Sequence, residues 1–165
     1  MIIGILSDTH DHPAAMAAGL DALKTAGAAF YIHCGDIGGQ ECIDLLAGLP
    51  AAFIFGNNDF DRAALSRYAA DLGVACYRNF ASLDLAAKRV GVHHGDDFRL
   101  RQRLIDEQEY DYLLQGHTHV RDDSRAGRTR LINPGALYRA KERTVATLDT
   151  DRDGVKFIVV DVEGR

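Results

Sequence analysis

Short apolar segments alternate with polar loops and amphipathic stretches through the first third of the chain. Residues 1–6 form an apolar run with β-branched side chains, and similar runs at 29–34 and 51–55 predict two further strands. Residues 13–26 and 40–46, which lie between these runs, have the composition and apolar spacing of helices. The succession of strand, polar loop and helix predicts parallel βαβ units, in which ligands bind at the carboxyl ends of the strands.

The pattern changes in the second half of the chain, where it favours antiparallel pairs. Residues 81–85 and 89–94 predict one hairpin, and residues 144–148 and 155–162 predict another around a turn at 151–154. Between the hairpins we expect a helix at 100–108, a strand at 112–115, and a polar segment at 122–130 that turns at Gly127. Early parallel units followed by hairpins predict an α/β fold with two mixed β-sheets and helices outside them. We expect one domain spanning residues 1–165.

Composition and charge narrow the classes of partner. The chain has 165 residues and a formal net charge of −5, which disfavours a large nucleic-acid duplex or an anionic membrane as the main partner. No apolar run approaches the roughly 20 residues of a membrane-spanning helix, and the first residues lack the basic flank of a signal peptide. The odd number of cysteines disfavours a disulfide framework and favours a reducing cytoplasm; they are Cys34, Cys42 and Cys76.

Groups that can bind a metal ion follow five of the apolar runs directly. The most distinctive stretch is Gly116-His117-Thr118-His119, which comes after the strand predicted at 112–115. The candidate ligands are Asp8, His10, Asp36, Asn57, His94, His117 and His119. Mixed oxygen and nitrogen donors suit Mn²⁺, Fe²⁺, Ni²⁺ or Zn²⁺, whereas the lack of thiolates disfavours a structural zinc site. Flanking glycines would let the backbone approach the ions closely.

Each of these groups also has an ordinary structural interpretation. Asp8 and Asp36 could cap the helices that follow them, and Asn57 could be a turn residue. His94 could be a hydrogen-bonded buried histidine, and the two histidines near residue 118 could be surface groups. Five strand ends that all carry metal-type ligands nevertheless favour one shared metal site over five separate accidents.

The ordered motifs also resemble a known family. They are Asp8-x-His10, Gly35-Asp36, Gly56-Asn57-x-Asp59, His94-Gly95 and Gly116-His117-x-His119, and together they closely resemble the calcineurin-like metallophosphoesterase superfamily. The small size, the Ser-Asp-Thr-His opening and Asn133-Pro134-Gly135 make the chain similar to the compact bacterial and archaeal phosphodiesterase branch, typified by the YfcE-like proteins. The resemblance extends from residue 2 to about residue 140.

The resemblance implies a fold, a metal centre and a reaction. The implied fold is the αββα sandwich of the metallo-dependent phosphatases, with a dinuclear centre at one edge. Asp8, His10, Asp36 and His119 would hold the first ion, and Asp36, Asn57, His94 and His117 the second, so that Asp36 bridges them. The cofactors would be two divalent ions, with manganese the first choice and nickel, iron or zinc the alternatives. A metal-bridging hydroxide would hydrolyse phosphodiesters, and monoesters as further substrates.

One position departs from the pattern of the family. Many relatives carry histidine directly after the asparagine of the Gly-Asn motif, where this chain has Asn58. An amide can donate a hydrogen bond to the substrate but cannot act as a general acid, so we expect aryl phosphodiesters to react faster than alkyl monoesters. Asp59 is expected to support catalysis by orienting a ligand or a bound water, with a solvated turn carboxylate as the alternative.

Several assignments stay open at this point. Phe98, Arg99 and Arg101 could shape the rim of the substrate site or simply begin an amphipathic helix, and His93 has no place in the family pattern. A non-catalytic scaffold similar to the retromer subunit of this fold is one alternative function, and a dinuclear hydrolase of amide or urea bonds is another. We expect a small phosphoester as the partner, no membrane, and antiparallel C-terminal strands that could pair in a homo-oligomer.

Overall fold

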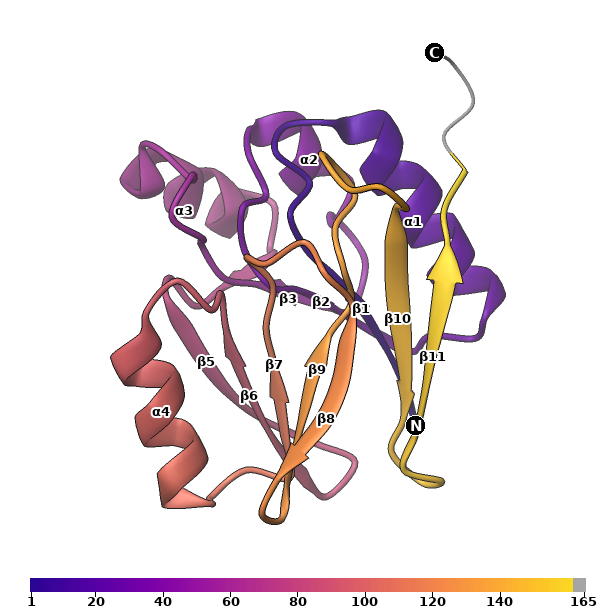
Figure 1. Cartoon of the computed structure of the whole chain (residues 1–165). Helices are drawn as coiled ribbons and strands as arrows, with labels where there is room; N and C mark the ends of the chain where they lie inside the picture. Colours follow the sequence, from indigo (N-terminus) through magenta and orange to yellow (C-terminus); the bar gives the residue numbers. More distant parts are fainter. Residues whose placement is uncertain (162–165) are drawn as a thin grey trace.

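The computed structural model describes residues 1–161, which form two stacked β-sheets with helices on both outer faces (Figure 1). The elements in chain order are β1 (Ile2–Leu6), α1 (Pro13–Thr25), β2 (Phe30–His33), α2 (Gln40–Asp44), β3 (Ala51–Phe53), α3 (Arg62–Asp71), β4 (Ala75–Cys76), β5 (Phe80–Leu85), β6 (Lys88–His93), α4 (Phe98–Glu107), β7 (Tyr112–Leu114), β8 (Asp122–Ala126), β9 (Thr129–Asn133), β10 (Thr144–Asp149) and β11 (Gly154–Val159). This arrangement confirms the predicted sandwich of two mixed sheets.

The first sheet has six strands in the order β11-β10-β1-β2-β3-β4. β1 to β4 run parallel, with Ile3 opposite Phe30 and Tyr31 opposite Ala51, as the βαβ pattern predicts. β10 returns antiparallel beside β1, and β11 pairs with β10 in the predicted hairpin. β1 is therefore an interior strand, and the loop after Leu6 leaves the sheet between its neighbours.

The second sheet has five strands in the order β5-β6-β7-β9-β8. β6, β7 and β9 are parallel, whereas β5 and β8 are antiparallel edge strands. The predicted hairpin of β5 and β6 is confirmed, with Leu83 opposite Val90. Parallel strands in both sheets place several loops at carboxyl ends, and these loops meet at one edge of the sandwich.

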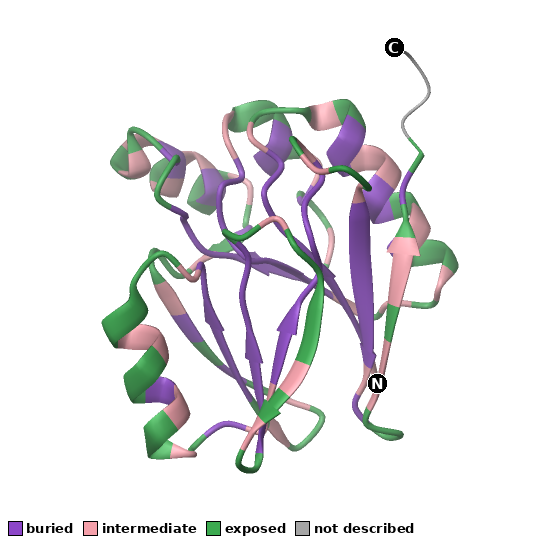
Figure 2. Cartoon of the chain, in the orientation of Figure 1, coloured by how far each residue is buried: buried purple, intermediate pink, exposed green. Residues whose placement is uncertain are grey.

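Alternation along the strands builds three apolar layers. In β1, Ile3 and Ile5 point into the layer between the sheets, whereas Leu6 points toward the helices that cover the first sheet. α1, α2 and α3 cover that outer face, and α4 covers the outer face of the second sheet through Leu104 (Figure 1). The helices bury one side and expose the other, while the central strands are almost wholly buried (Figure 2).

Some elements differ from the sequence predictions. α3, from Arg62 to Asp71, was not predicted, and the polar segment at 122–130 contains β8 and the start of β9 around the expected turn at Gly127. α4 begins two residues earlier than expected, and β3 ends at Phe53 instead of residue 55. The predicted strand at 155–162 ends at Val159, and residue 162 lies outside the described residues. No helix within residues 1–161 is long and apolar enough to cross a bilayer.

A cluster of charges on Asp153 joins the two sheets at the end opposite the loops. Arg130 Nη1 and the Tyr112 hydroxyl donate to Asp153 Oδ1 over 2.9 and 3.0 Å, and Arg125 pairs with the other oxygen. Asp153 belongs to the turn between β10 and β11 in the first sheet, whereas its three partners lie on strands of the second. Burial raises the pKa of Asp153, but these donors more than offset it and hold that pKa below its usual value.

Replacing Asp153 is therefore expected to lower the stability of the fold. Asp153→Ala should reduce the free energy of unfolding by about 1 kcal/mol, because the side chain is partly exposed and its ion pairs are screened. Urea denaturation at pH 7 measures the loss. Because folding lowers the pKa of Asp153, its contribution is present near neutrality and should be lost as the pH falls through the range of carboxyl groups. Asp84→Ala, at an exposed position of β5, is the matched control, and an equal loss in both variants would contradict the prediction.

Candidate metal centre

Five loops converge at the carboxyl ends of β1, β2, β3, β6 and β7. Asp8 follows β1, Asp36 follows β2, and His94 directly follows β6. Backbone hydrogen bonds extend beyond the strands and hold the loops together. Asp8 N–H donates to the Gly35 carbonyl over 3.0 Å, and Gly116 N–H donates to the His94 carbonyl over 2.8 Å. The ladders of both sheets thus position the loops that carry the candidate ligands.

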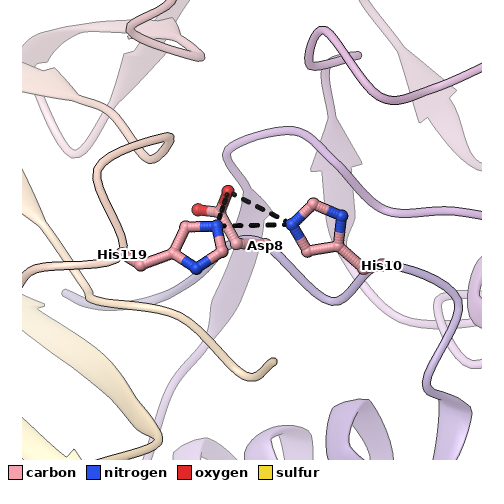
Figure 3. A group of neighbouring side chains, drawn as sticks. All are labelled: Asp8, His10 and His119. Carbon is pink, nitrogen blue, oxygen red and sulfur yellow. Dashed lines mark hydrogen bonds and ion pairs between the residues drawn. The ribbon is translucent and has the colours of Figure 1, made fainter. Parts of the chain in front are cut away.

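The first cluster consists of Asp8, His10 and His119, whose donor atoms face one point (Figure 3). Asp8 Oδ1 lies 3.2 Å from His119 Nε2 and 3.9 Å from His10 Nε2. The two histidine Nε2 atoms are 3.3 Å apart. Asp8 Oδ2 accepts the His117 N–H over 3.0 Å, which leaves Oδ1 free to face the cluster. One carboxylate oxygen and two imidazole nitrogens can therefore reach a common cation.

The second cluster consists of Asp8, Asp36 and His94, and all three side chains are buried. His94 Nε2 lies 3.2 Å from Asp36 Oδ2 and 4.0 Å from Asp8 Oδ1. Asp36 Oδ2 also lies 3.7 Å from His10 Nε2 in the first cluster. Asp36 therefore stands between His10 and His94, which is the place that the resemblance implies for a bridging carboxylate.

Asn57 and His117 lie next to the second cluster but turn toward each other. His117 Nδ1 is 3.0 Å from Asn57 Oδ1, and both residues are exposed. The His117 ring meets the His94 ring edge-on, with 5.2 Å between their centroids. All seven candidate ligands are thus at one edge of the sandwich, five of them in the two clusters and two beside them.

Buried polar atoms without partners show that the clusters fit a cation. Asp8 Oδ1 and His94 Nε2 are both buried, and each lies 3.2 Å from a charged neighbour, His119 Nε2 and Asp36 Oδ2, but neither contact has the geometry of a hydrogen bond. A buried acceptor without a donor is costly, so native proteins rarely leave one unless an ion or a water binds there. His94 Nδ1 lies 2.9 Å from the Cys34 carbonyl, to which it donates, and this leaves the Nε2 lone pair for a metal.

The clusters also perturb each other's pKa values. Burial raises the pKa of Asp36, but the contact with His94 and the hydrogen bonds from Asn58 lower it by a larger amount. The resulting pKa of Asp36 lies well below its usual value. Burial lowers the pKa of His94, but Asp36 and Asp8 outweigh this and raise it to about 8. Both shifts arise largely from the favourable contact between the His94 ring and the carboxylate of Asp36. A divalent ion would displace the proton of His94 on binding.

The backbone of the site adopts the left-handed conformation at five ligand positions. Asp8, His10, Asp36, His117 and His119 have φ angles of 55°, 49°, 54°, 70° and 58°. Residues with side chains rarely adopt such angles, and strained backbone of this kind gathers at functional sites. Close approach is the second constraint, because a Cβ at Gly56 would overlap Asp36 Oδ1 and one at Gly116 would overlap Ser7 Oγ.

Asn58 and Asp59 both organise the loop that carries Asp36. Asn58 donates to both carboxylate oxygens of Asp36, from its N–H over 2.7 Å and from Nδ2 over 2.8 Å. Asp59 accepts the Gly38 and Gly56 N–H groups over 2.8 and 2.7 Å. Asp59 is only 3% exposed, so the alternative of a solvated turn carboxylate is wrong. Instead it ties the loop after β2 to the loop after β3.

Several residues at the site were not singled out from the sequence. A cleft of about 640 Å³ opens beside His10 and Asp36, and its walls include His12, Phe60, Tyr138 and Arg139. No short motif marks these positions, although Tyr138 comes three residues after Asn133-Pro134-Gly135. His33 is also buried beneath the site, where its Nε2 lies 2.7 Å from Thr9 Oγ1.

Other candidates lie away from this cleft. Phe98, Arg99 and Arg101 form the first turn of α4, which favours the helix-start interpretation over a substrate rim, and they do not line the cleft. His93 ends β6 and is 1% exposed.

Comparison with known proteins agrees with this geometry. The family model of the calcineurin-like phosphoesterase superfamily domain matches residues 1–153. The phosphodiesterase MJ0936 of Methanocaldococcus jannaschii is 30% identical over 166 residues, which cover 98% of this chain and 100% of that protein. The solved structure of an archaeal phosphodiesterase superposes with a TM-score of 0.89 at 28% identity, covering 97% of this chain and 100% of the other. The fold is also that of YfcE, a phosphoesterase from E. coli, with a TM-score of 0.69, 18% identity and coverage of 98% and 100%.

Proposed function

This chain belongs to the calcineurin-like phosphoesterase superfamily, and on that premise we propose that it hydrolyses phosphodiesters at a centre of two divalent cations. The observation that carries the proposal is the pair of clusters that share Asp8, with Asp36 Oδ2 3.7 Å from His10 Nε2 in the other cluster. We assign Asp8, His10, Asp36 and His119 to one ion, and Asp36, Asn57, His94 and His117 to the other. The relative from Methanocaldococcus jannaschii, which matches over its whole length, is named a phosphodiesterase and supports the same reaction class.

The ions, when bound, supply an activated water and neutralise charge on the phosphate. The protein's own contribution is to hold the ligands in place before the substrate arrives. Asp59 ties two ligand loops together, and the Cys34 carbonyl orients the His94 ring. Ser7 has no role as a nucleophile in this scheme, because its hydroxyl is buried and donates to the Gly35 carbonyl over 3.4 Å.

Asn58 is the residue that we propose contacts the substrate. Its Nδ2 donates to Asp36 Oδ2, so it stands at the open side of the centre, and its side chain is exposed. When Asp36 binds cations, the Asn58 amide can turn its N–H toward a phosphate oxygen. An amide cannot protonate a leaving alkoxide at neutral pH, so the leaving group must be acidic enough to depart unaided.

This assignment predicts a marked preference among phosphoesters. Turnover of bis(4-nitrophenyl) phosphate should exceed turnover of an alkyl monoester by about 10²–10⁴-fold, the usual contribution of a general acid. Asn58→His should narrow that gap by raising the rate on the alkyl ester. The kcat/KM values of both substrates with the metal-loaded protein measure the effect, with Asn79→His as a control outside the cleft. Equal rates on the two esters in the unaltered protein would contradict the role given to Asn58.

Three finer assignments complete the proposal. We name manganese as the preferred ion, with nickel, iron and zinc as the alternatives, because first-row ions share these ligands and availability selects among them. We place the protein in the cytoplasm, since the structure describes all three cysteines as free thiols. The hairpin of β10 and β11 leaves β11 at the edge of its sheet, where a second copy could pair in a homo-oligomer.

The alternative function as a non-catalytic scaffold is not favoured. A scaffold needs no metal ligands, yet all candidate ligands lie together here, with two buried atoms that lack a partner. Hydrolysis of an amide or urea bond would use the same ions, but membership of a phosphoesterase superfamily argues for phosphoesters. A metal-dependent turnover assay with an aryl phosphodiester separates all three functions, since neither alternative predicts release of the phenol.

A further inference from the structure

We propose that the cleft beside the metal centre binds a flat, uncharged aromatic group of the phosphodiester, either a nucleobase or a simple aryl group. The inference rests on the proposed function only in placing the phosphate at the two clusters. The cleft begins at His10, Asp36 and Asn58, and the loops that lead into α1, α2 and α3 line it together with residues 138 and 139. Its volume of about 640 Å³ is in the range of pockets that bind drug-sized molecules and is far larger than a phosphate needs.

One wall of the cleft is an aromatic stack fixed to the metal-binding loop. The Tyr138 ring stacks on the His12 ring with 3.8 Å between centroids and an interplanar angle of 23°. Tyr138 N–H donates to the Asp8 carbonyl over 3.1 Å, so the stack has a set distance from the first cluster. The Arg139 guanidinium lies over the same ring at 5.2 Å. A rigid wall of this kind can hold a flat group without loss of side-chain freedom.

The lining of the cleft also includes an exposed aromatic side chain. Phe60 is 78% exposed at the start of the α3 region and lines the cleft together with Ala64 and Leu65. Covering an exposed phenyl ring with a flat apolar group removes apolar surface from water and so contributes favourably to the free energy of binding. The cleft therefore offers aromatic surface from two separate segments of the chain, the Tyr138 stack and Phe60.

The charges of the cleft exclude a second anionic group. Asp11 and Asp61 line it, and each accepts a backbone N–H, Asp11 from Gly39 over 2.9 Å and Asp61 from Ala64 over 3.3 Å. Arg139 also lines the cleft and carries a positive charge. Carboxylates fixed in this way repel phosphates beyond the one bound at the ions, so the group that enters is uncharged.

Binding of stable phosphonates tests the assignment without relying on turnover. Calorimetry of the metal-loaded protein should show that phenylphosphonate binds about tenfold more tightly than methylphosphonate, because stacking adds to a shared phosphonate contact. Phe60→Ala and Tyr138→Leu should each reduce that ratio at least about threefold, while thermal unfolding checks that both variants fold. Phe98→Ala, at the 69% exposed phenylalanine of α4, is the matched control and should leave the ratio unchanged.

The outcomes separate this inference from the proposed function. Equal binding of the two phosphonates, or a ratio that neither cleft variant alters, overturns the aromatic assignment even if phosphodiesters are hydrolysed. A tighter phenylphosphonate supports it even if turnover fails, and in that case only the reaction is wrong. Adenosine 5′-monophosphate serves as a further arm, because tighter binding than methylphosphonate assigns a nucleobase, whereas tighter binding of phenylphosphonate alone assigns a simple aryl group.

Discussion

Asp36→Asn is expected to abolish turnover of an aryl phosphodiester, with kcat reduced by about 10³-fold or more. Asp36 Oδ2 stands between His10 and His94, so the amide that replaces it weakens both proposed ion sites at once. A cation contributes several kcal/mol to the charge that develops on a phosphate, and each 1.36 kcal/mol is a factor of ten in rate. Metal analysis of the purified variant should show a loss of bound ions in parallel with the loss of activity.

Asparagine is the suitable replacement because it keeps the backbone conformation. Position 36 has a φ of 54°, which Asn tolerates better than most residues, so the replacement adds no backbone strain. Asp84→Asn is the matched control, since it removes an exposed carboxylate of β5 that belongs to neither cluster and does not line the cleft. Full activity of Asp36→Asn without bound metal would refute the assignment of the centre.

Removal of the metal is expected to have the second large effect. Treatment with a chelator should reduce the activity of the protein by more than about 100-fold. Adding back a single kind of divalent ion should restore the activity, and binding should saturate at two ions per chain. Binding to the folded state alone also stabilises it, by about 3–4 kcal/mol when the ion is present at 100 to 1,000 times its Kd. For a domain of this size the Tm should then rise by about 6–16 °C, at about 2–4 °C for each kcal/mol.

The two readouts of this experiment check each other. Activity shows whether the ions take part in the reaction, and the Tm shows whether they bind the folded chain. His93→Ala is a useful reference for the thermal measurement, because His93 is buried beside His94 but belongs to neither cluster. Unchanged activity after complete removal of metal would rule out the mechanism, whereas saturation at one ion per chain would leave a mononuclear centre.

Much of the fold was predictable because its strands carry strong patterns. The buried runs of β1, β2 and β3 and the alternating hairpin of β5 and β6 have clear periodicity. α3 was missed because it buries only Leu65 and Ala69, which makes its apolar stripe too narrow to stand out. β8 was missed for a related reason, since it is an edge strand without a fully buried residue. The conformation of such segments depends on packing against elements that are distant in the sequence, and a single sequence does not show which elements those are.

The candidate ligands were found because each follows a strand directly, so that sheet topology brings them together. The walls of the cleft could not be found in this way. Tyr138 reaches the centre because its N–H bonds the carbonyl of Asp8, a residue 130 positions away in the chain. Phe60 and His12 lie on loops whose course depends on the helices that follow them. Contacts of this kind arise from packing between distant segments and leave no local signature.

The left-handed backbone at the candidate ligands carries conformational strain, which a protein with a purely structural role would not need. Glycine at position 119 would relax the φ angle of 58°, a strain of roughly 1 kcal/mol for a residue with a side chain. We would therefore expect a non-catalytic protein of this fold to have glycine or asparagine at such positions and a higher Tm. Aspartate and histidine at five such angles place a local conformational cost in the same loops that carry the candidate ligands.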